Sequence, residues 1–179
     1  MLTIENSILV VIDIQDSLAQ VMHEKETLFE NLEKIIKGAT ILGIPMIVTE
    51  QVPEKLGATI PKISSLLDTV RPIPKSSFSC CGEALFMREL EDIKRTQILV
   101  AGIESHVCVY QTTVDLIRKG YEAHIVTDCI SSRTADNKTL GIERMTSEGA
   151  KPTSVEMALF ELLKSSGGDG FREISRLVK

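Results

Sequence analysis

The chain of 179 residues contains no tryptophan, and aromatic side chains make up only 4% of it. Its formal net charge is −5 and it has no cluster of Lys and Arg, so it lacks the basic stripe typical of nucleic-acid-binding proteins. No apolar run reaches the roughly 18 residues that a membrane span needs. The first 16 residues lack a basic segment followed by a long apolar one, which argues against a signal peptide. We therefore expect a cytoplasmic protein without a nucleic-acid or membrane partner.

The sequence also lacks the clustered cysteines and histidines of a structural zinc site. Its three histidines are scattered, and no two of its cysteines form a CxxC pair. A disulfide framework is not expected in a cytosolic chain of this size. The first β–α turn has no glycine fingerprint for a dinucleotide, so we predict no cofactor. Each cysteine then needs its own explanation: Cys80, Cys81, Cys108 and Cys129.

Continuous apolar runs alternate with amphipathic segments along the chain. The runs at 7–14, 44–50, 96–103 and 121–130 predict buried strands, and the proline-punctuated 69–75 predicts an edge strand at best. Helical spacing appears at 26–43, 82–94, 107–120 and after Gly167, and 131–149 is a polar lead-in followed by a helix. The segment 151–164 predicts a short extended piece and then a helix that Ser154 caps, whereas 51–63 is typical of a loop. This alternation predicts an α/β fold, a Rossmann-like three-layer sandwich whose mostly parallel sheet of about six strands has helices on both faces. At this length we expect a single domain, 1–179.

Three chemically capable side chains lie at predicted strand ends, where open parallel sheets bind their ligands. Asp13 follows the first strand, Lys75 ends the short third, and Cys108 opens the helix after the fourth. Free N–H groups and the helix dipole there favour a thiolate and could stabilise an oxyanion. Asp13 could act as base for the thiol, and the Lys75 ammonium could hold both anions. Plain alternatives are a buried Cys108, a hydrogen-bonded Asp13 and a solvated Lys75.

Other cysteine chemistries are less well supported. A Cys–His pair is disfavoured, because His106 lies only two residues before Cys108 and His124 lies inside a strand. The vicinal Cys80 and Cys81 could be redox-active, although packing at a helix start explains them more simply.

The motifs around the three strand-end residues resemble those of a known family. They are VVIDIQ with Asp13, PKSSFS with Lys75, and VAGIESHVCV with Cys108. In this order, over nearly the whole chain, they are similar to the isochorismatase-like cysteine hydrolases, which include nicotinamidases and N-carbamoylsarcosine amidohydrolase. The segments TEQVPEKLGATIP and TDCISSR look most like the isochorismatase-domain-containing proteins.

The resemblance implies a role for each residue. Asp13 would be the base, Lys75 would orient and polarise, and Cys108 would attack a carbonyl carbon to form a thioester that water then hydrolyses. It also implies a cis peptide bond at Ile103–Glu104 and an oxyanion hole formed by the backbone N–H groups of Glu104 and Cys108.

Departures from the family pattern narrow the expected reaction. Nicotinamidases have Asp and His metal ligands after the second strand, but TEQVPEKLGATIP contains no His, so we expect no catalytic metal. Some isochorismate-cleaving members lack the cysteine, whereas this chain keeps it, which favours hydrolysis of an amide or ureido C–N bond in a small molecule. The alternative is a catalytically silent member that binds a metabolite or a protein.

The substrate pocket is the least determined part of the prediction. We expect Gln15, Gln51, Phe78 and Ile103 to line it, with Tyr110 or a neighbouring subunit completing its wall. Specificity would depend on loops 51–63 and 131–140. The resemblance further implies a homo-oligomer, a dimer or larger.

Overall fold

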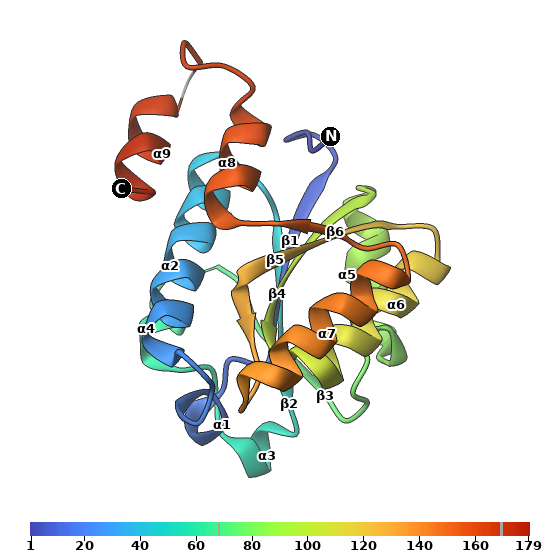
Figure 1. Ribbon diagram of the computed structural model, residues 1–179. Helices are drawn as coiled ribbons and strands as arrows, with labels where there is room; N and C mark the ends of the chain where they lie inside the picture. The colour runs from blue at the N-terminus through green and yellow to red at the C-terminus, as the bar shows by residue number, and fades with distance from the viewer. Residues whose placement is uncertain (68, 169) are drawn as a thin grey trace.

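The computed structural model describes residues 1–67, 69–168 and 170–179, and its centre is one parallel sheet. The strand order is β3-β2-β1-β4-β5-β6, with every neighbouring pair parallel (Figure 1). The predicted α/β fold is thus confirmed, with a strand order that reverses between β1 and β4. The strands are β1 (Ser7–Ile12), β2 (Met46–Gln51), β3 (Ile73–Lys75), β4 (Gln97–Ile103), β5 (Glu122–Ser131) and β6 (Lys151–Thr153).

Helices cover both faces of the sheet (Figure 1). One face carries α2 (Lys25–Ile41), α4 (Pro61–Ser64), α8 (Val155–Leu163) and α9 (Phe171–Leu177). The other carries α5 (Ala84–Ile93), α6 (Tyr110–Arg118) and α7 (Ala135–Ser147). The short α1 (Asp16–Gln20) and α3 (Pro53–Leu56) lie beyond the carboxyl ends of the strands. Of the residues described, none form a helix long and apolar enough to cross a membrane.

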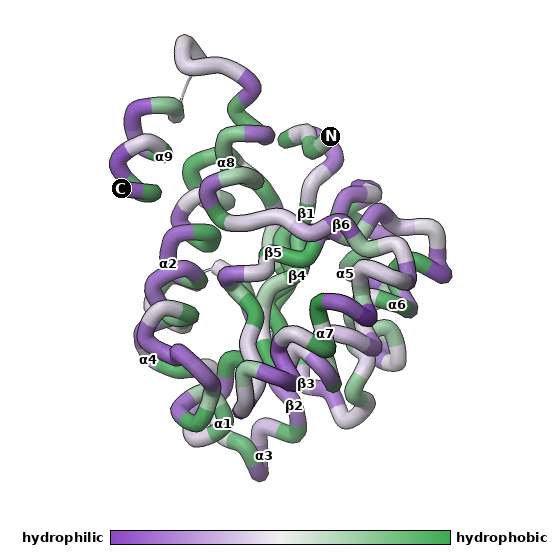
Figure 2. Tube along the Cα trace, viewed as in Figure 1, coloured by the Kyte–Doolittle hydropathy of each residue, from purple (hydrophilic) through white to green (hydrophobic). Residues whose placement is uncertain are grey.

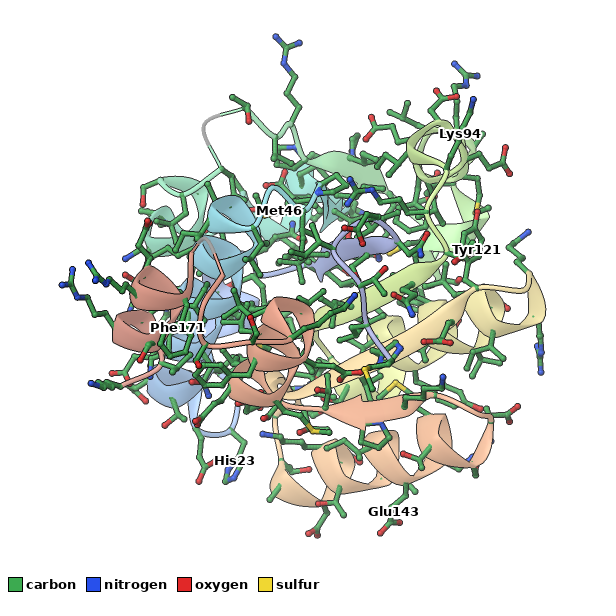
Figure 3. The ribbon with its side chains drawn as sticks, turned by 90° about the horizontal axis from the view of Figure 1, so that it is seen from above. His23, Met46, Lys94, Tyr121, Glu143 and Phe171 are labelled. Carbon is green, nitrogen blue, oxygen red and sulfur yellow. The ribbon has the colours of Figure 1, made fainter. Side chains whose placement is uncertain are left out.

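Alternating strand side chains divide the core into two apolar layers. Leu9 and Val11 of β1 face α2 and α8, whereas Val10 and Ile12 face the opposite layer. The hydrophobic centre and hydrophilic exterior are visible in Figure 2. Seen from above, charged side chains such as Glu143 extend outward from the helices (Figure 3). Strands buried on both faces explain why the sequence shows continuous apolar runs and not an alternation of apolar and polar residues.

Some predicted boundaries were wrong. The loop expected at 51–63 contains the two short helices α3 and α4, each with proline in its first turn, where a fixed φ favours helix. The sequence pattern also missed α1. The first strand ends at Ile12, not at residue 14, because Asp13 adopts a left-handed φ of 55°. The predicted edge strand β3 and the Ser154 cap of α8, which accepts from Met157 N, are confirmed.

The two central strands approach each other closely at Gly102. A Cβ at this position would lie 2.2 Å from the carbonyl oxygen of Ile12, and its φ is +126°. Only glycine permits this approach without a backbone shift. It brings the segments that follow β1 and β4 together at the reversal of strand order, where ligands bind in such sheets.

Candidate active site

Asp13 follows β1 directly and is 1% exposed. Its left-handed backbone conformation, which aspartate tolerates better than most residues, ends the strand. Oδ1 accepts a hydrogen bond from Thr49 Oγ1 at 2.8 Å, and Oδ2 lies 2.7 Å from Lys75 Nζ. A buried carboxylate therefore has one oxygen hydrogen-bonded and the other next to a cation.

Lys75 ends β3 and is fully buried at its side chain. Its Nζ donates to Gln51 Oε1 and to the carbonyl oxygens of Ser77 and Phe78, both at 3.2 Å. These bonds account for the three ammonium hydrogens. Among the described residues, Asp13 Oδ2 consequently receives no aligned hydrogen bond, and its contact with Nζ is an ion pair. This oxygen keeps a lone pair free to accept a proton.

The charge state of Lys75 follows from two opposing effects. Burial lowers the pKa of the Lys75 ammonium, but the negative charge of the neighbouring Asp13 carboxylate raises it, and the net shift is upward. The lysine is therefore a cation at neutral pH.

Cys108 lies beside this pair in a single π-helical turn, Ser105–Val109, which leads into α6. Its exposure is 8%. Burial raises the pKa of the Cys108 thiol to about 12; the charge of Asp13 adds to this rise and Lys75 opposes it. The expected thiolate at a helix start is thus not the resting form, because desolvation and the charge of Asp13 outweigh the charge of Lys75. The thiol carries its proton and has a carboxylate next to it.

The turn that holds Cys108 is tightly supported. It follows a cis peptide bond at Ile103–Glu104, the position that the family resemblance implied. The Glu104 carbonyl accepts from Val109 N at 3.2 Å, and its carboxylate accepts from Arg133 N and Nε at 3.2 and 3.1 Å. On the other side, a Cβ on Gly141 of α7 would lie 2.8 Å from the Ser105 carbonyl group. The helix α7 therefore packs directly against this turn.

The two glutamines predicted to line the pocket connect neighbouring strand ends by hydrogen bonds. Gln15 is fully buried; its Nε2 donates to the carbonyl oxygens of Gln51 and Gly57, and its Oε1 accepts from Gln51 N at 2.6 Å. Gln51 accepts from Lys75 and donates from Nε2 to Ser76 O at 2.9 Å. Both side chains therefore join the ends of β1, β2 and β3 around the ion pair.

The other predicted pocket residues differ in exposure. Ile103 is fully buried, whereas Phe78 is 54% exposed and contributes its carbonyl oxygen to Lys75. The Tyr110 hydroxyl accepts from Arg144 Nη2 at 2.9 Å. A cavity of about 240 Å³ adjoins Lys75; its other lining residues are Val52, Pro53, Glu54, Pro74, Ser76 and Glu83.

Neither of the two histidines weighed as partners of the thiol is directed toward it. His106 Nδ1 lies 2.9 Å from Ser132 Oγ, and His124 Nε2 lies 2.6 Å from Glu122 Oε1. Within residues 1–67, 69–168 and 170–179, no group of three or more His, Cys, Asp or Glu side chains is arranged to hold a metal ion.

Three further side chains of the site were not predicted. Thr49 bonds Asp13, Cys80 contacts Thr49, and Glu83 Oε1 accepts from Ser77 Oγ, Ser77 N and Ser76 N. The Ser77 bonds lower the pKa of Glu83, which braces the segment after Lys75. Thr49 was visible as a strand-end residue, but no local pattern reveals a bond between residues 36 positions apart.

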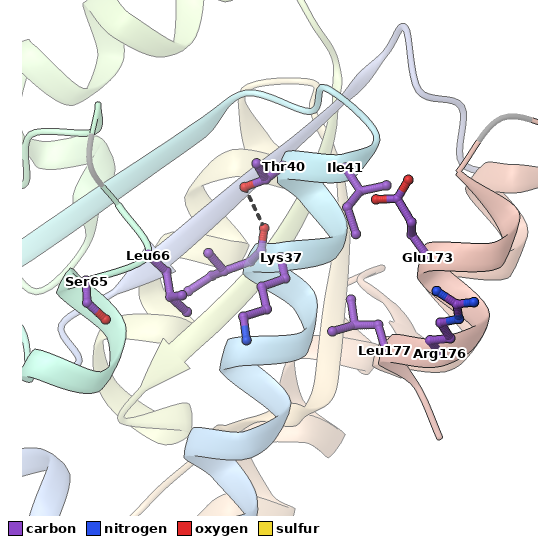
Figure 4. A pocket seen from close by; sticks show the side chains of 9 residues that line it. Lys37, Thr40, Ile41, Ser65, Leu66, Glu173, Arg176 and Leu177 are labelled. Carbon is purple, nitrogen blue, oxygen red and sulfur yellow. Dashed lines mark hydrogen bonds between the residues drawn. The ribbon is translucent and has the colours of Figure 1, made fainter.

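A larger cavity of about 600 Å³ lies between α2 and α9 on one face of the sheet, not at the strand carboxyl ends (Figure 4). Aliphatic side chains such as Leu66 and Leu177 line it together with Lys37 and Arg176. The described residues that line it include no cysteine, so the candidate active site stays at the end of β1 and β4.

Comparison with known proteins decides the family. The isochorismatase domain model matches residues 7–157. The chain belongs to the isochorismatase family. Members of this family are generally hydrolases.

Individual relatives extend this likeness over the whole chain. The secreted isochorismatase effector Isc1 of Phytophthora sojae is 35% identical, over 97% of this chain and 85% of its own length. The structure of the MAR1 ribonuclease from Caenorhabditis elegans aligns with a TM-score of 0.94 and 33% identity, over 99% of this chain and 91% of that one. The Escherichia coli YcaC gene product, described as an octameric hydrolase of unknown specificity, aligns with a TM-score of 0.93 and 18% identity, over 98% and 88%. Because one relative is secreted, the cytoplasmic location stays a prediction.

Proposed function

We propose that this isochorismatase-family protein is a cysteine hydrolase that cleaves an amide or ureido C–N bond of a small molecule through a thioester. The observation that carries the proposal is the buried Asp13 carboxylate, whose Oδ2 forms an ion pair with Lys75 and which lies next to the protonated Cys108 thiol. A neutral thiol with an adjacent base is an activated nucleophile, even where the hydrogen bond tightens only when substrate binds.

In the first half of the reaction, Cys108 Sγ attacks the carbonyl carbon while its proton passes to Asp13 Oδ2. The carbonyl oxygen gains the electron pair and lies near the backbone N–H groups of Glu104 and Cys108, which we assign as the oxyanion hole. Collapse of this intermediate breaks the C–N bond. Asp13 gives its proton to the leaving nitrogen, and the acyl group stays on sulfur as a thioester.

In the second half, water attacks the thioester carbon and gives one proton to Asp13. The C–S bond breaks, the acid product leaves, and the thiolate recovers its proton from Asp13. Lys75 stays cationic throughout, which stabilises the carboxylate form of Asp13 between these transfers. Asp13 therefore accepts and releases one proton in each half-reaction, and its ion pair with Lys75 favours the return to the carboxylate form.

Trapping of the acyl intermediate tests this reaction. Wild type, Cys108→Ala and the control Cys81→Ala are incubated with a panel of primary amides and ureido compounds, and intact mass and acid release are measured. We expect an acyl adduct and turnover in wild type and Cys81→Ala alone. Equal activity, or equal inactivity across the panel, of wild type and Cys108→Ala would contradict the proposal and support a silent binding module.

An RNA substrate is added to the panel, because one relative is described as a ribonuclease. The net charge of −5 gives this chain no electrostatic attraction to a phosphate backbone. We therefore expect no cleavage of RNA. Cleavage that depends on Cys108 would replace the proposed substrate class.

Alkylation of Cys108 tests the base without any substrate. Because the charge of Asp13 raises the pKa of the thiol, Asp13→Asn should speed reaction with iodoacetamide if charge alone matters. If Asp13 takes the proton, Asp13→Asn should instead slow alkylation at pH 7 by about tenfold or more. Peptide mass spectrometry of the Cys108 peptide gives the rate, and acceleration would refute the role of Asp13 as base.

We also propose that the chain acts as a homo-oligomer of single-domain subunits, since YcaC is described as octameric. Light scattering coupled to size-exclusion chromatography measures the assembly, and a monomer at micromolar concentration would contradict this part of the proposal.

A further inference from the structure

A second buried thiol, Cys80, contacts both halves of the candidate active site. Cys80 is fully buried, and its backbone N donates to Thr112 Oγ1 of α6 at 3.0 Å. Its Sγ donates to Thr49 Oγ1 at 3.7 Å, and Thr49 Oγ1 donates in turn to Asp13 Oδ1 at 2.8 Å. One residue therefore links the base, through Thr49, with the helix that continues from the Cys108 turn.

The direction of these bonds follows from the number of hydrogens available. The Thr49 hydroxyl has one hydrogen, and Asp13 as a carboxylate can only accept it. Thr49 must therefore act as acceptor toward Cys80. Burial raises the pKa of the Cys80 thiol to about 11, so at neutral pH this thiol still has its hydrogen to donate. The chain of donors runs one way, from Cys80 through Thr49 into Asp13 Oδ1.

We infer that Cys80 and Thr49 are positioning residues for the base, an inference that rests on the proposed function. Their bonds fix the plane of the Asp13 carboxylate so that Oδ1 is occupied and Oδ2 faces Lys75, in the carboxylate that adjoins Cys108. Neither residue touches substrate in this arrangement, because Thr49 and Cys80 are both fully buried. The two neighbouring cysteines therefore differ in role: the buried Cys80 thiol positions the base, and the half-buried Cys81 thiol does not.

Simple packing is the competing explanation, since a buried cysteine often acts only as a small apolar side chain. The two explanations differ in what serine should do at this position. A hydroxyl keeps the donor to Thr49 but is a poorer apolar filler, whereas alanine keeps an apolar side chain and removes the donor. Packing therefore favours Cys80→Ala, and positioning favours Cys80→Ser.

The test is the rate of Cys108 alkylation by iodoacetamide from pH 5 to 10, with wild type, Cys80→Ala, Cys80→Ser, Thr49→Val and Thr49→Ser. We expect Cys80→Ala and Thr49→Val to lower the rate at neutral pH by about threefold to tenfold, the typical worth of one hydrogen bond. The acid limb of the profile should also move to higher pH, because a carboxylate that has lost a donor takes up a proton more easily. Cys80→Ser and Thr49→Ser should restore both features, and Cys81→Ala should match wild type.

Two outcomes would overturn the inference. One is a Cys80→Ala profile identical to that of Cys81→Ala, and the other is a Cys80→Ser profile as impaired as that of Cys80→Ala. Asp13→Asn separates this failure from failure of the proposed function: if Asp13→Asn slows alkylation while Cys80→Ala does not, Asp13 is the base without help from Cys80. Thermal unfolding of each variant identifies any that is misfolded. If a Cys80 variant is misfolded, the alkylation rates of Thr49→Val and Thr49→Ser test the inference in its place.

Discussion

The two edges of the sheet each carry a lysine–carboxylate pair, and the pairs differ in what surrounds them. At the carboxyl edge, Asp13 and Lys75 lie 2.7 Å apart with side chains 1% and 0% exposed. At the amino edge, Glu122 and Lys151 lie 2.9 Å apart with side chains 34% and 51% exposed. The two ion pairs therefore have the same charges at similar distances, but the protein interior surrounds one pair and water surrounds the other.

The two edges also differ in how fully the carboxylate oxygens are hydrogen-bonded. Glu122 Oε1 contacts His124 Nε2 and accepts from Gln97 Nε2, while Oε2 contacts Lys151. Among the described residues, Asp13 Oδ2 has no aligned hydrogen bond and is held by its ion pair with Lys75. A carboxylate that is hydrated and fully hydrogen-bonded has little tendency to take up a proton, whereas a buried carboxylate with a free lone pair can accept one. The comparison shows that an ion pair points to chemistry when it is both buried and incompletely hydrogen-bonded.

The largest expected difference comes from removing each lysine. Lys75→Met leaves the Asp13 charge buried without its partner, so the free energy of unfolding should fall by about 3–5 kcal/mol. Lys151→Met removes a solvated partner and should cost no more than about 1 kcal/mol. Urea unfolding at pH 7 measures both. Equal losses would mean that burial does not distinguish the two edges.

A double substitution should separate stability from function at the carboxyl edge. Neutral replacements of both partners, Asp13→Asn with Lys75→Met, leave no uncompensated charge, so about 1–4 kcal/mol of the loss in Lys75→Met should return. Cys108 alkylation at neutral pH should nevertheless stay slow, because the base is absent. Recovery of both properties together would show that the ion pair serves folding alone.

The smallest expected effect concerns pH at the amino edge. Hydrogen bonds from His124 and Lys151 lower the pKa of Glu122 from 4.5 to about 2. The folded state therefore gains stability above pH 4.5 and loses it as the pH falls from 4.5 toward 2. Because the group is partly exposed, we expect no more than about 1 kcal/mol from it. The difference in unfolding free energy between wild type and Glu122→Gln should shrink over this range, and a constant difference would contradict the assignment.

Much of the fold and the location of the site could be predicted from the residues alone. Apolar runs such as 96–103 are long enough for strands buried on both faces, and helical spacing separates them. Carboxyl ends of parallel strands lie at one edge, so Asp13, Lys75 and Cys108 were expected to meet, and the structure places them together. Their catalytic roles stay a proposal.

The tertiary structure alone decided how these side chains are held and charged. Burial, which depends on the packed core, reversed the expected thiolate character of Cys108. The partners of Asp13 come from 36 residues away in Thr49 and from β3, and the glutamines predicted to line the pocket bond the backbone and Lys75. The periodicity of the local sequence indicates where the strands and helices lie and where each strand ends. Hydrogen-bond partners and desolvation depend on neighbours distant in the chain, which only the assembled sheet brings together.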